Sequence, residues 1–256
     1  MQFRPCIDIH NGKVKQIVGS SLKDEGNQAT ENYVSTEDAA YFANLYKKNH
    51  LKSGHIILLN SVDSPYYHAT KQQALSALAA YPEGMQIGGG ITAENAAEFI
   101  KAGASHVIVT SYVFRQGQIL WEHLNKLLEA VGKEHIVLDL SCRKKANKYY
   151  VATDRWQTVT NIEVCADLLK KLSPYCDEFL IHAVDVEGKN SGIETDLVKL
   201  LSQTDAVITY AGGIHDFEDL ELLKEIGNGK IHATIGSALD LFGGHMSFEK
   251  VVSFLE

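Results

Sequence analysis

The stretch that decides the fold is Gly88-Gly89-Gly90-Ile91-Thr92, because the second half of the chain repeats it as Ala211-Gly212-Gly213-Ile214-His215. A helical pattern follows each copy and leads into a short apolar run that ends in a hydroxyl residue. These runs are Val107-Ile108-Val109-Thr110-Ser111 and Ala233-Thr234-Ile235-Gly236-Ser237. A repeat of about half the chain predicts two similar halves that close one shape and carry duplicated sites.

The repeat extends to the beginning of each half. Cys6-Ile7-Asp8-Ile9 matches Val137-Leu138-Asp139-Leu140, so that an aspartate lies near the end of an apolar run in both halves. A long irregular stretch follows each run, over residues 12–35 and 141–160. Long connections of this kind carry function in many folds, so we expect a matched pair of functional loops.

Apolar runs with the pattern of strands alternate with amphipathic helical runs along the whole chain. We expect strands at residues 3–9, 55–60, 85–88, 106–110, 135–140, 178–184, 206–210 and 232–235, and helices that include 36–49, 69–80, 93–102, 161–172 and 247–255. Eight evenly spaced strand–helix units predict an α/β protein, a (β/α)8 TIM barrel built from two similar half-barrels. A doubly wound sheet alternates in the same way, but it binds its ligand at one switch point, whereas the glycine signature is duplicated here. Barrels of this length are single domains, and we expect one domain over residues 1–256.

The composition of the chain argues against several classes of binding partner. The formal net charge of −8 argues against a nucleic acid, because phosphate backbones recruit basic surfaces. No run approaches the roughly 20 apolar residues of a membrane span, and residues 1–8 already have a strand pattern, so we expect no signal peptide and no membrane partner. The four cysteines show no paired spacing, which is typical of reduced thiols in a cytoplasmic protein. No apolar surface stripe is evident, so we expect a monomer.

The two aspartates are the first candidate catalytic groups. Alternate side chains of a strand point into a barrel, and strands 1 and 5 of an eight-stranded ring lie opposite each other. Asp8 and Asp139 are therefore expected to face each other across one pocket, as a general acid and a general base. The alternative is that each aspartate only caps a turn.

The glycine segments predict anion sites. Gly212 and Gly213 come where a strand ends and a helix begins, and Gly236 and Ser237 follow the next strand. Barrels often bind phosphate with the loops after strands 7 and 8 and a short extra helix, here expected to end near Gly243. The repeat supplies a second set, so we expect one phosphate at each side of the pocket; tight turns are the alternative for each set. The second set consists of Gly89, Gly90, Thr110 and Ser111.

Two further residues are candidates, and no metal ligands are evident. Trp156, in the loop after strand 5, either anchors that loop or stacks on a flat heterocycle. Glu187, after strand 6, is either an additional acid in the pocket or a solvated carboxylate. The histidines form no His-x-x-x-His pair and the cysteines no Cys-x-x-Cys pair, so we expect no metal.

A set of segments resembles a known family. The residues are Arg4-Pro5-Cys6-Ile7-Asp8-Ile9-His10-Asn11-Gly12-Lys13-Val14-Lys15, His182-Ala183-Val184-Asp185-Val186-Glu187-Gly188, Gly88-Gly89-Gly90-Ile91 and Ala211-Gly212-Gly213-Ile214. Over essentially the whole chain they resemble the phosphoribosylformimino-aminoimidazole carboxamide ribotide isomerases of histidine biosynthesis, and most closely their eukaryotic branch. The resemblance implies a duplicated barrel that works without a cofactor on a small bisphosphorylated ribonucleotide.

The implied reaction is an Amadori rearrangement of the aminoaldose ProFAR to the aminoketose PRFAR. An acid protonates the ribose ring oxygen and opens the ring to a Schiff base, and a base then removes the C2′ proton. By resemblance Asp8 is the base and Asp139 the acid. Bacterial members carry Thr-Asp where this chain has His182-Ala183, and Arg-Asp-Gly where it has Val186-Glu187-Gly188. This departure leaves Asp139 and Glu187 as alternative proton donors.

Two other functions fit parts of the pattern. The cyclase subunit of imidazole glycerol phosphate synthase, a lyase, also has opposed aspartates and paired phosphate sites, but it needs ammonia from a glutaminase. A non-catalytic phosphosugar-binding paralogue would keep the glycines and lose Asp8 or Asp139, both of which are present.

Overall fold

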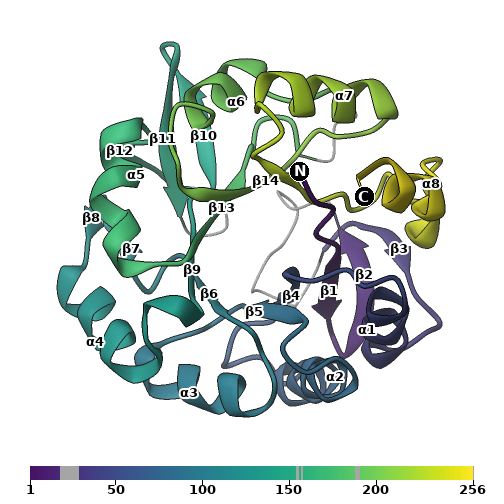
Figure 1. Cartoon of the computed structure of the whole chain (residues 1–256). Helices are drawn as coiled ribbons and strands as arrows, with labels where there is room; N and C mark the ends of the chain where they lie inside the picture. The colour runs from purple at the N-terminus through teal and green to yellow at the C-terminus, as the bar shows by residue number, and fades with distance from the viewer. Residues whose placement is uncertain (18–28, 154–155, 157, 188–190, 256) are drawn as a thin grey trace.

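The structure is a computed structural model, and it describes residues 1–17, 29–153, 156, 158–187 and 191–255. Within these residues, eight parallel strands form a closed ring with helices outside it (Figure 1). In chain order the strands are β1 (Cys6–His10), β4 (Gly54–Leu58), β5 (Met85–Gly88), β6 (Val107–Val109), β9 (Ile136–Asp139), β13 (Glu178–His182), β14 (Val207–Ala211) and β15 (His232–Ala233).

The ring closes between its first and last strands. A parallel bridge joins Phe3 to Ala233, and the Arg4 amide donates to the Ala233 carbonyl oxygen at 2.8 Å. In the resulting order β1 and β9 lie opposite each other, so each half of the chain supplies four neighbouring strands. The predicted (β/α)8 barrel is confirmed.

The helices cover the outside of the ring (Figure 1). They are α1 (Ala39–Lys48), α2 (Tyr67–Ala80), α3 (Ala93–Lys101), α4 (Trp121–Val131), α5 (Ala166–Leu172), α6 (Thr195–Leu201), α7 (Phe217–Ile226) and α8 (Phe248–Leu255). Their start signals are local: the Asp38 carboxylate accepts from the Tyr41 amide before α1, and the Asn95 side chain accepts from the Thr92 amide at the start of α3. Both contacts satisfy amides that a helix leaves unpaired in its first turn.

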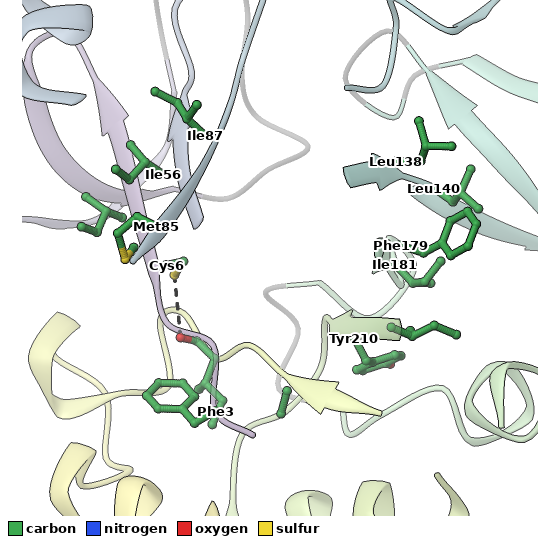
Figure 2. Packing of buried hydrophobic residues seen from close by; sticks show 14 of the residues in the cluster. Phe3, Cys6, Ile56, Met85, Ile87, Leu138, Leu140, Phe179, Ile181 and Tyr210 are labelled. Carbon is green, nitrogen blue, oxygen red and sulfur yellow. Dashed lines mark hydrogen bonds between the residues drawn. The ribbon is translucent and has the colours of Figure 1, made fainter. Parts of the chain in front are cut away.

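Two apolar clusters hold the barrel together. The larger cluster includes Phe99, Leu124 and Phe179, and Figure 2 shows part of it. Inside the ring, a smaller cluster is made by Ile108, Val137, Leu180 and Ala211. Each fully buried large apolar side chain stabilises the fold by about 1.5–3 kcal/mol.

A polar group closes the amino-terminal end of the barrel. Arg4 forms a buried ion pair with Glu178, whose carboxylate also accepts from Thr209 and, at 2.8 Å, from Gln86. A buried charge is tolerated when it is paired and hydrogen-bonded in this way. This end is therefore filled, and the carboxyl-terminal end is left for a site.

Both long stretches after the first and fifth strands contain extra strands. β2 (Lys13–Ile17) and β3 (Glu31–Val34) follow β1, and β10 (Cys142–Lys145), β11 (Lys148–Thr153) and β12 (Thr158–Glu163) form a separate sheet after β9. The remaining short elements are β7 (Phe114–Arg115), β8 (Gln118–Ile119) and the 3-10 turns η3 (Lys133–His135), η4 (Ser173–Tyr175) and η5 (Asp240–Phe242). No helix in the described part of the chain combines the length and apolar character that a membrane crossing requires.

Two local predictions need correction. The helix expected from residue 161 begins only at Ala166, because residues 158–163 pair with β11 as strand β12 and the Thr160 hydroxyl donates to the Val151 carbonyl oxygen at 2.8 Å. The short helix expected to open at residues 236–239 is a 3-10 turn over Asp240–Phe242; it ends where expected, with Gly243 as its cap at a φ of 80°.

Candidate active site

A cavity opens at the carboxyl-terminal ends of the strands, where β1, β9 and β13 contribute Asp8, Asp139 and His182. Both predicted aspartates line it from opposite sides of the ring, which is where barrels of this fold carry their chemistry. The other predicted residues that line it are Glu187, Trp156, Gly212, Gly213, Gly236 and Ser237.

Asp8 has few hydrogen-bonding partners in this cavity. The Gln16 amide nitrogen from β2 donates to Asp8 Oδ2 at 3.4 Å. Burial first, and then the nearby charge of Glu187, raise the pKa of Asp8 to about 7 against the opposing effect of His182. A carboxyl group with a pKa near neutrality can both accept and release a proton at working pH.

Asp139 is surrounded by donors. Its Oδ2 accepts from the Thr110 hydroxyl at 3.1 Å, and its Oδ1 accepts from the Ser141 hydroxyl at 3.0 Å. His182 Nδ1 lies 3.3 Å from the same Oδ1. Both oxygens of the Asp139 carboxyl group are therefore used as hydrogen-bond acceptors.

His182 and Glu187 complete the charged cluster. Burial on its own would lower the pKa of His182, but Asp139, Glu187 and Asp8 raise it to about 8. Burial raises the pKa of Glu187, and His182 opposes that rise. The Trp156 ring lies with its centroid 5.9 Å from that of His182, at an interplanar angle of 44°. The carboxyl groups of Asp8, Asp139 and Glu187 therefore all interact electrostatically with the His182 imidazole.

Two other groups of the cavity are electrically neutral. His55 has its pKa lowered to about 3, first by burial and then by the charge of His182. Burial raises the pKa of the Cys6 thiol well above its ordinary value. Burial therefore keeps the Cys6 thiol in its neutral form, which is not the nucleophilic one.

The second glycine segment is built tightly into the cavity wall. Gly213 has a φ of 80°, and a Cβ there would lie 2.1 Å from the Gly192 carbonyl oxygen. A Cβ on Gly236 would lie 2.6 Å from Gln16 Oε1. Within the described residues, the amides of Gly213, Ser237 and Ala238 donate to no backbone carbonyl. Such amides are available to an anion.

The first glycine segment has a different place. Gly90 and Ser111 are exposed, and neither they nor Gly89 and Thr110 belong to the described lining of the cavity. Gly89 has a φ of 102° and would bring a Cβ within 2.2 Å of the Leu58 carbonyl oxygen. Thr110 reaches the cavity only through its bond to Asp139. The residues predicted to form the second phosphate site therefore lie outside the described lining of the cavity, and we call this position the rim.

Sequence reasoning missed three polar groups of the site. The sequence shows His182 only as part of a motif, Gln16 only as part of the irregular stretch 12–35, and Thr234 only as part of the repeat. Thr234 is 7% exposed and lines the cavity, and its hydroxyl has no partner among the described residues. The alternation of polar residues along 182–187 was the one available signal; the other two needed the register of the sheet.

One cluster has the side-chain types of a cation site. His215, Asp216 and Asp219 bring one ligand atom each within 4.8 Å of one another at the start of α7, outside the cavity lining. His215 already pairs with Asp219 at 2.6 Å and with Asp216 at 3.2 Å. The expectation that the chain needs no metal stays a prediction.

The sequence is similar to known proteins over nearly its whole length. The family described as "Histidine biosynthesis protein" matches residues 2–246. This chain belongs to that family. A chloroplastic relative from Medicago truncatula is 49% identical over 259 residues, which covers 99% of this chain and 81% of the relative.

Fungal members of the histidine biosynthesis family are similar over nearly their whole length. The relative from Neurospora crassa is 47% identical, and the match covers 95% of this chain and 93% of the relative. The relative from Saccharomyces cerevisiae is 43% identical, and the match covers 96% of this chain and 94% of the relative. All three are named as isomerases of an imidazole-4-carboxamide that carries two phosphoribosyl groups.

Proposed function

We propose that this chain is the isomerase that converts ProFAR to PRFAR in histidine biosynthesis by an Amadori rearrangement, with no cofactor. The observation that carries the proposal is that Asp8 and Asp139, on opposite strands, line one cavity together with the second glycine turn. The names of the relatives agree with this activity and favour neither the lyase nor the non-catalytic paralogue.

Asp8 acts as the base that takes the C2′ proton. Its pKa of about 7 supports this role, because a base works best when its pKa is close to the operating pH. The proton for the ribose ring oxygen comes from another acid of the cavity, for which Asp139, opposite Asp8, and Glu187 are the candidate carboxyl groups. Each positioned proton transfer contributes about 10²–10⁴-fold to the rate.

Phosphate binding has two parts in this proposal. Amides and hydroxyls of Gly212, Gly213, Gly236 and Ser237 hold one phosphate against the cavity wall. The rim set of Gly89, Gly90, Thr110 and Ser111 holds the other, so that the substrate spans the mouth of the barrel. Trp156 stacks on the imidazole ring of the substrate, and its position beside His182 in the cavity supports this role.

We further propose that residues 1–256 work as one domain and as a monomer in the cytoplasm. The bridge from Phe3 to Ala233 ties the two ends of the barrel together, which supports the single domain. The net charge of −8 makes a nucleic acid partner unfavourable. The Medicago truncatula relative is named as chloroplastic.

The test is an assay of the purified protein with ProFAR in the absence of ammonia. Formation of the ketose, followed by chromatography, is the expected result. Consumption of the ketose that requires added ammonia would instead identify the cyclase, and binding without turnover would identify the paralogue. Light scattering at assay concentration tests the monomer.

A further inference from the structure

His182 is the one group of the site whose chemistry the two aspartates do not explain. It is the last residue of β13, it lines the cavity, and its side chain is 16% exposed. Nδ1 points to Asp139 Oδ1 at 3.3 Å, whereas Nε2 makes no hydrogen bond within the described residues. One nitrogen is thus held by the protein and the other is left for a ligand.

The bonds around Asp139 assign the proton within this pair. Its two oxygens accept from Thr110, Ser141 and His182, so the carboxylate is already used as an acceptor on both sides. A proton on Asp139 would remove one of these bonds. The anionic form keeps all of them and stabilises a cationic imidazole beside it.

Within the described residues, the other titratable groups that act on His182 either add negative charge or are neutral. Glu187 and Asp8 add negative charge, and His55, whose ring centroid is 6.4 Å away, is uncharged because its pKa is about 3. Together with Asp139 they raise the pKa of His182 to about 8 despite its burial. At neutral pH the imidazole therefore carries its second proton.

We propose that His182, held at Nδ1 by Asp139, is the group that gives its Nε2 proton to the ribose ring oxygen. This inference rests on the proposed isomerase function and specifies its acid: the donor is an imidazolium, and Asp139 is its positioning residue. The arrangement of a carboxylate that orients and charges a histidine is a recurrent one in acid–base catalysis.

The proton and electron changes balance within the site. As the ring C–O bond breaks, its electron pair takes the proton from His182, and the nitrogen lone pair forms the C1′=N bond. Asp8 then takes the C2′ proton, and the C–H electrons form the C1′=C2′ bond while the C=N electrons return to nitrogen. Asp8 returns its proton to C1′, and the enol hydroxyl gives its proton to neutral His182 as the ketone forms. Both groups end as they began.

The test compares His182→Gln and His182→Asn with His106→Gln. His106 forms a similar pair with Asp177, at 3.2 Å, but outside the cavity lining, so it controls for loss of a histidine–aspartate contact. The wild type should lose kcat/KM above about pH 8 as His182 loses its proton. Both His182 variants should lose about 10²–10⁴-fold in kcat and no longer show that limb, with product affinity within a few-fold of the wild type. His106→Gln should keep the wild-type kcat and the wild-type loss of kcat/KM above about pH 8.

A second measurement concerns the pair itself. NMR titration of the histidine ring signals should give His182 a lower pKa in Asp139→Asn than in the wild type, because a positive charge loses its anionic partner. A wild type that isomerises ProFAR while folded His182→Gln keeps its rate and its alkaline limb would overturn this inference and leave the isomerase proposal intact. A wild type that does not isomerise ProFAR would overturn both. An unchanged imidazole pKa in Asp139→Asn would also count against the pairing.

Discussion

Asp8 and Asp139 occupy equivalent places in the two half-barrels, yet their surroundings differ. Asp8 accepts one long side-chain hydrogen bond, from Gln16 at 3.4 Å, and its pKa is raised to about 7. Asp139 accepts from two hydroxyls and faces an imidazole. The repeated strand places both carboxyl groups at equivalent positions, and the neighbouring side chains that differ between the halves determine the role of each one.

The glycine turns show the same contrast. Gly213 is packed under the Gly192 carbonyl in the cavity wall, whereas Gly90 is exposed on the rim with Val62 as its nearest neighbour at 3.3 Å from a Cβ. The second glycine of the two repeated turns therefore has backbone packed against it in one half and only a side chain in the other. The following predictions test this difference between the halves.

The largest effect is expected for Asp8→Asn. The amide cannot take the C2′ proton, so kcat should fall by about 10⁴-fold, at the upper end for loss of a positioned base. Because the phosphate sites are untouched, the affinity for product should change by less than about threefold. Steady-state kinetics and isothermal titration calorimetry measure the two quantities, and a kcat within tenfold of the wild type would show that Asp8 is not the base.

The two aspartates should have opposite effects on stability. The pKa of Asp8 rises on folding from 3.8 to about 7, so ionisation of this carboxyl group destabilises the fold. The contribution of protonated Asp8 to the free energy of unfolding is complete below pH 3.8 and is lost as pH rises through 7. At pH 8 Asp8→Asn should therefore increase the free energy of unfolding, by about 4 kcal/mol at most.

Asp139→Asn should instead lower the free energy of unfolding at pH 8 by about 2 kcal/mol, because its donors lose a charged acceptor. Urea denaturation at pH 8 and at pH 4 measures both variants, and the gain from Asp8→Asn should shrink at the lower pH. The same sign for the two variants at pH 8 would contradict the difference in their surroundings.

The glycine turns provide a smaller, matched pair of substitutions. Gly213→Ala adds a Cβ at 2.1 Å from a carbonyl oxygen in a left-handed backbone and should lower the free energy of unfolding by about 3 kcal/mol. Gly90→Ala meets only the Val62 side chain and should cost about 1 kcal/mol. Thermal and urea denaturation compare them, and equal losses would mean that the two turns are constrained alike.

The smallest effect is expected for Glu187→Gln. The charge of Glu187 is the second cause of the raised pKa of Asp8, so its removal should lower that pKa. The acid limb of the kcat/KM profile, which reports ionisation of the base, should move to lower pH, while kcat falls by about tenfold or less. A loss as large as that of Asp8→Asn would make Glu187 the proton donor and leave no need for His182 in that role.

Much of this structure follows from local sequence. Alternation of polar and apolar residues placed Asp8 and Asp139 on inward faces, and the repeat placed their strands opposite each other. The helix expected from residue 161 was wrong because its first residues continue the β-branched strand Thr158–Glu163, which pairs with β11, a partner that a local pattern does not reveal. The role of Gln16 also depends on register, since Ile9 pairs with Val14 and this brings Gln16 to Asp8.

The sequence by itself determined the barrel, its two halves and the positions of the paired carboxyl groups and glycine turns, because periodicity and repetition are properties of the chain. Only the tertiary structure decided that Asp139 is paired with His182 while Asp8 is buried beside Glu187, and that one glycine turn closes the cavity while the other stays on the rim. The reason is physical: protonation and packing depend on groups that are distant in sequence and meet only when the ring closes.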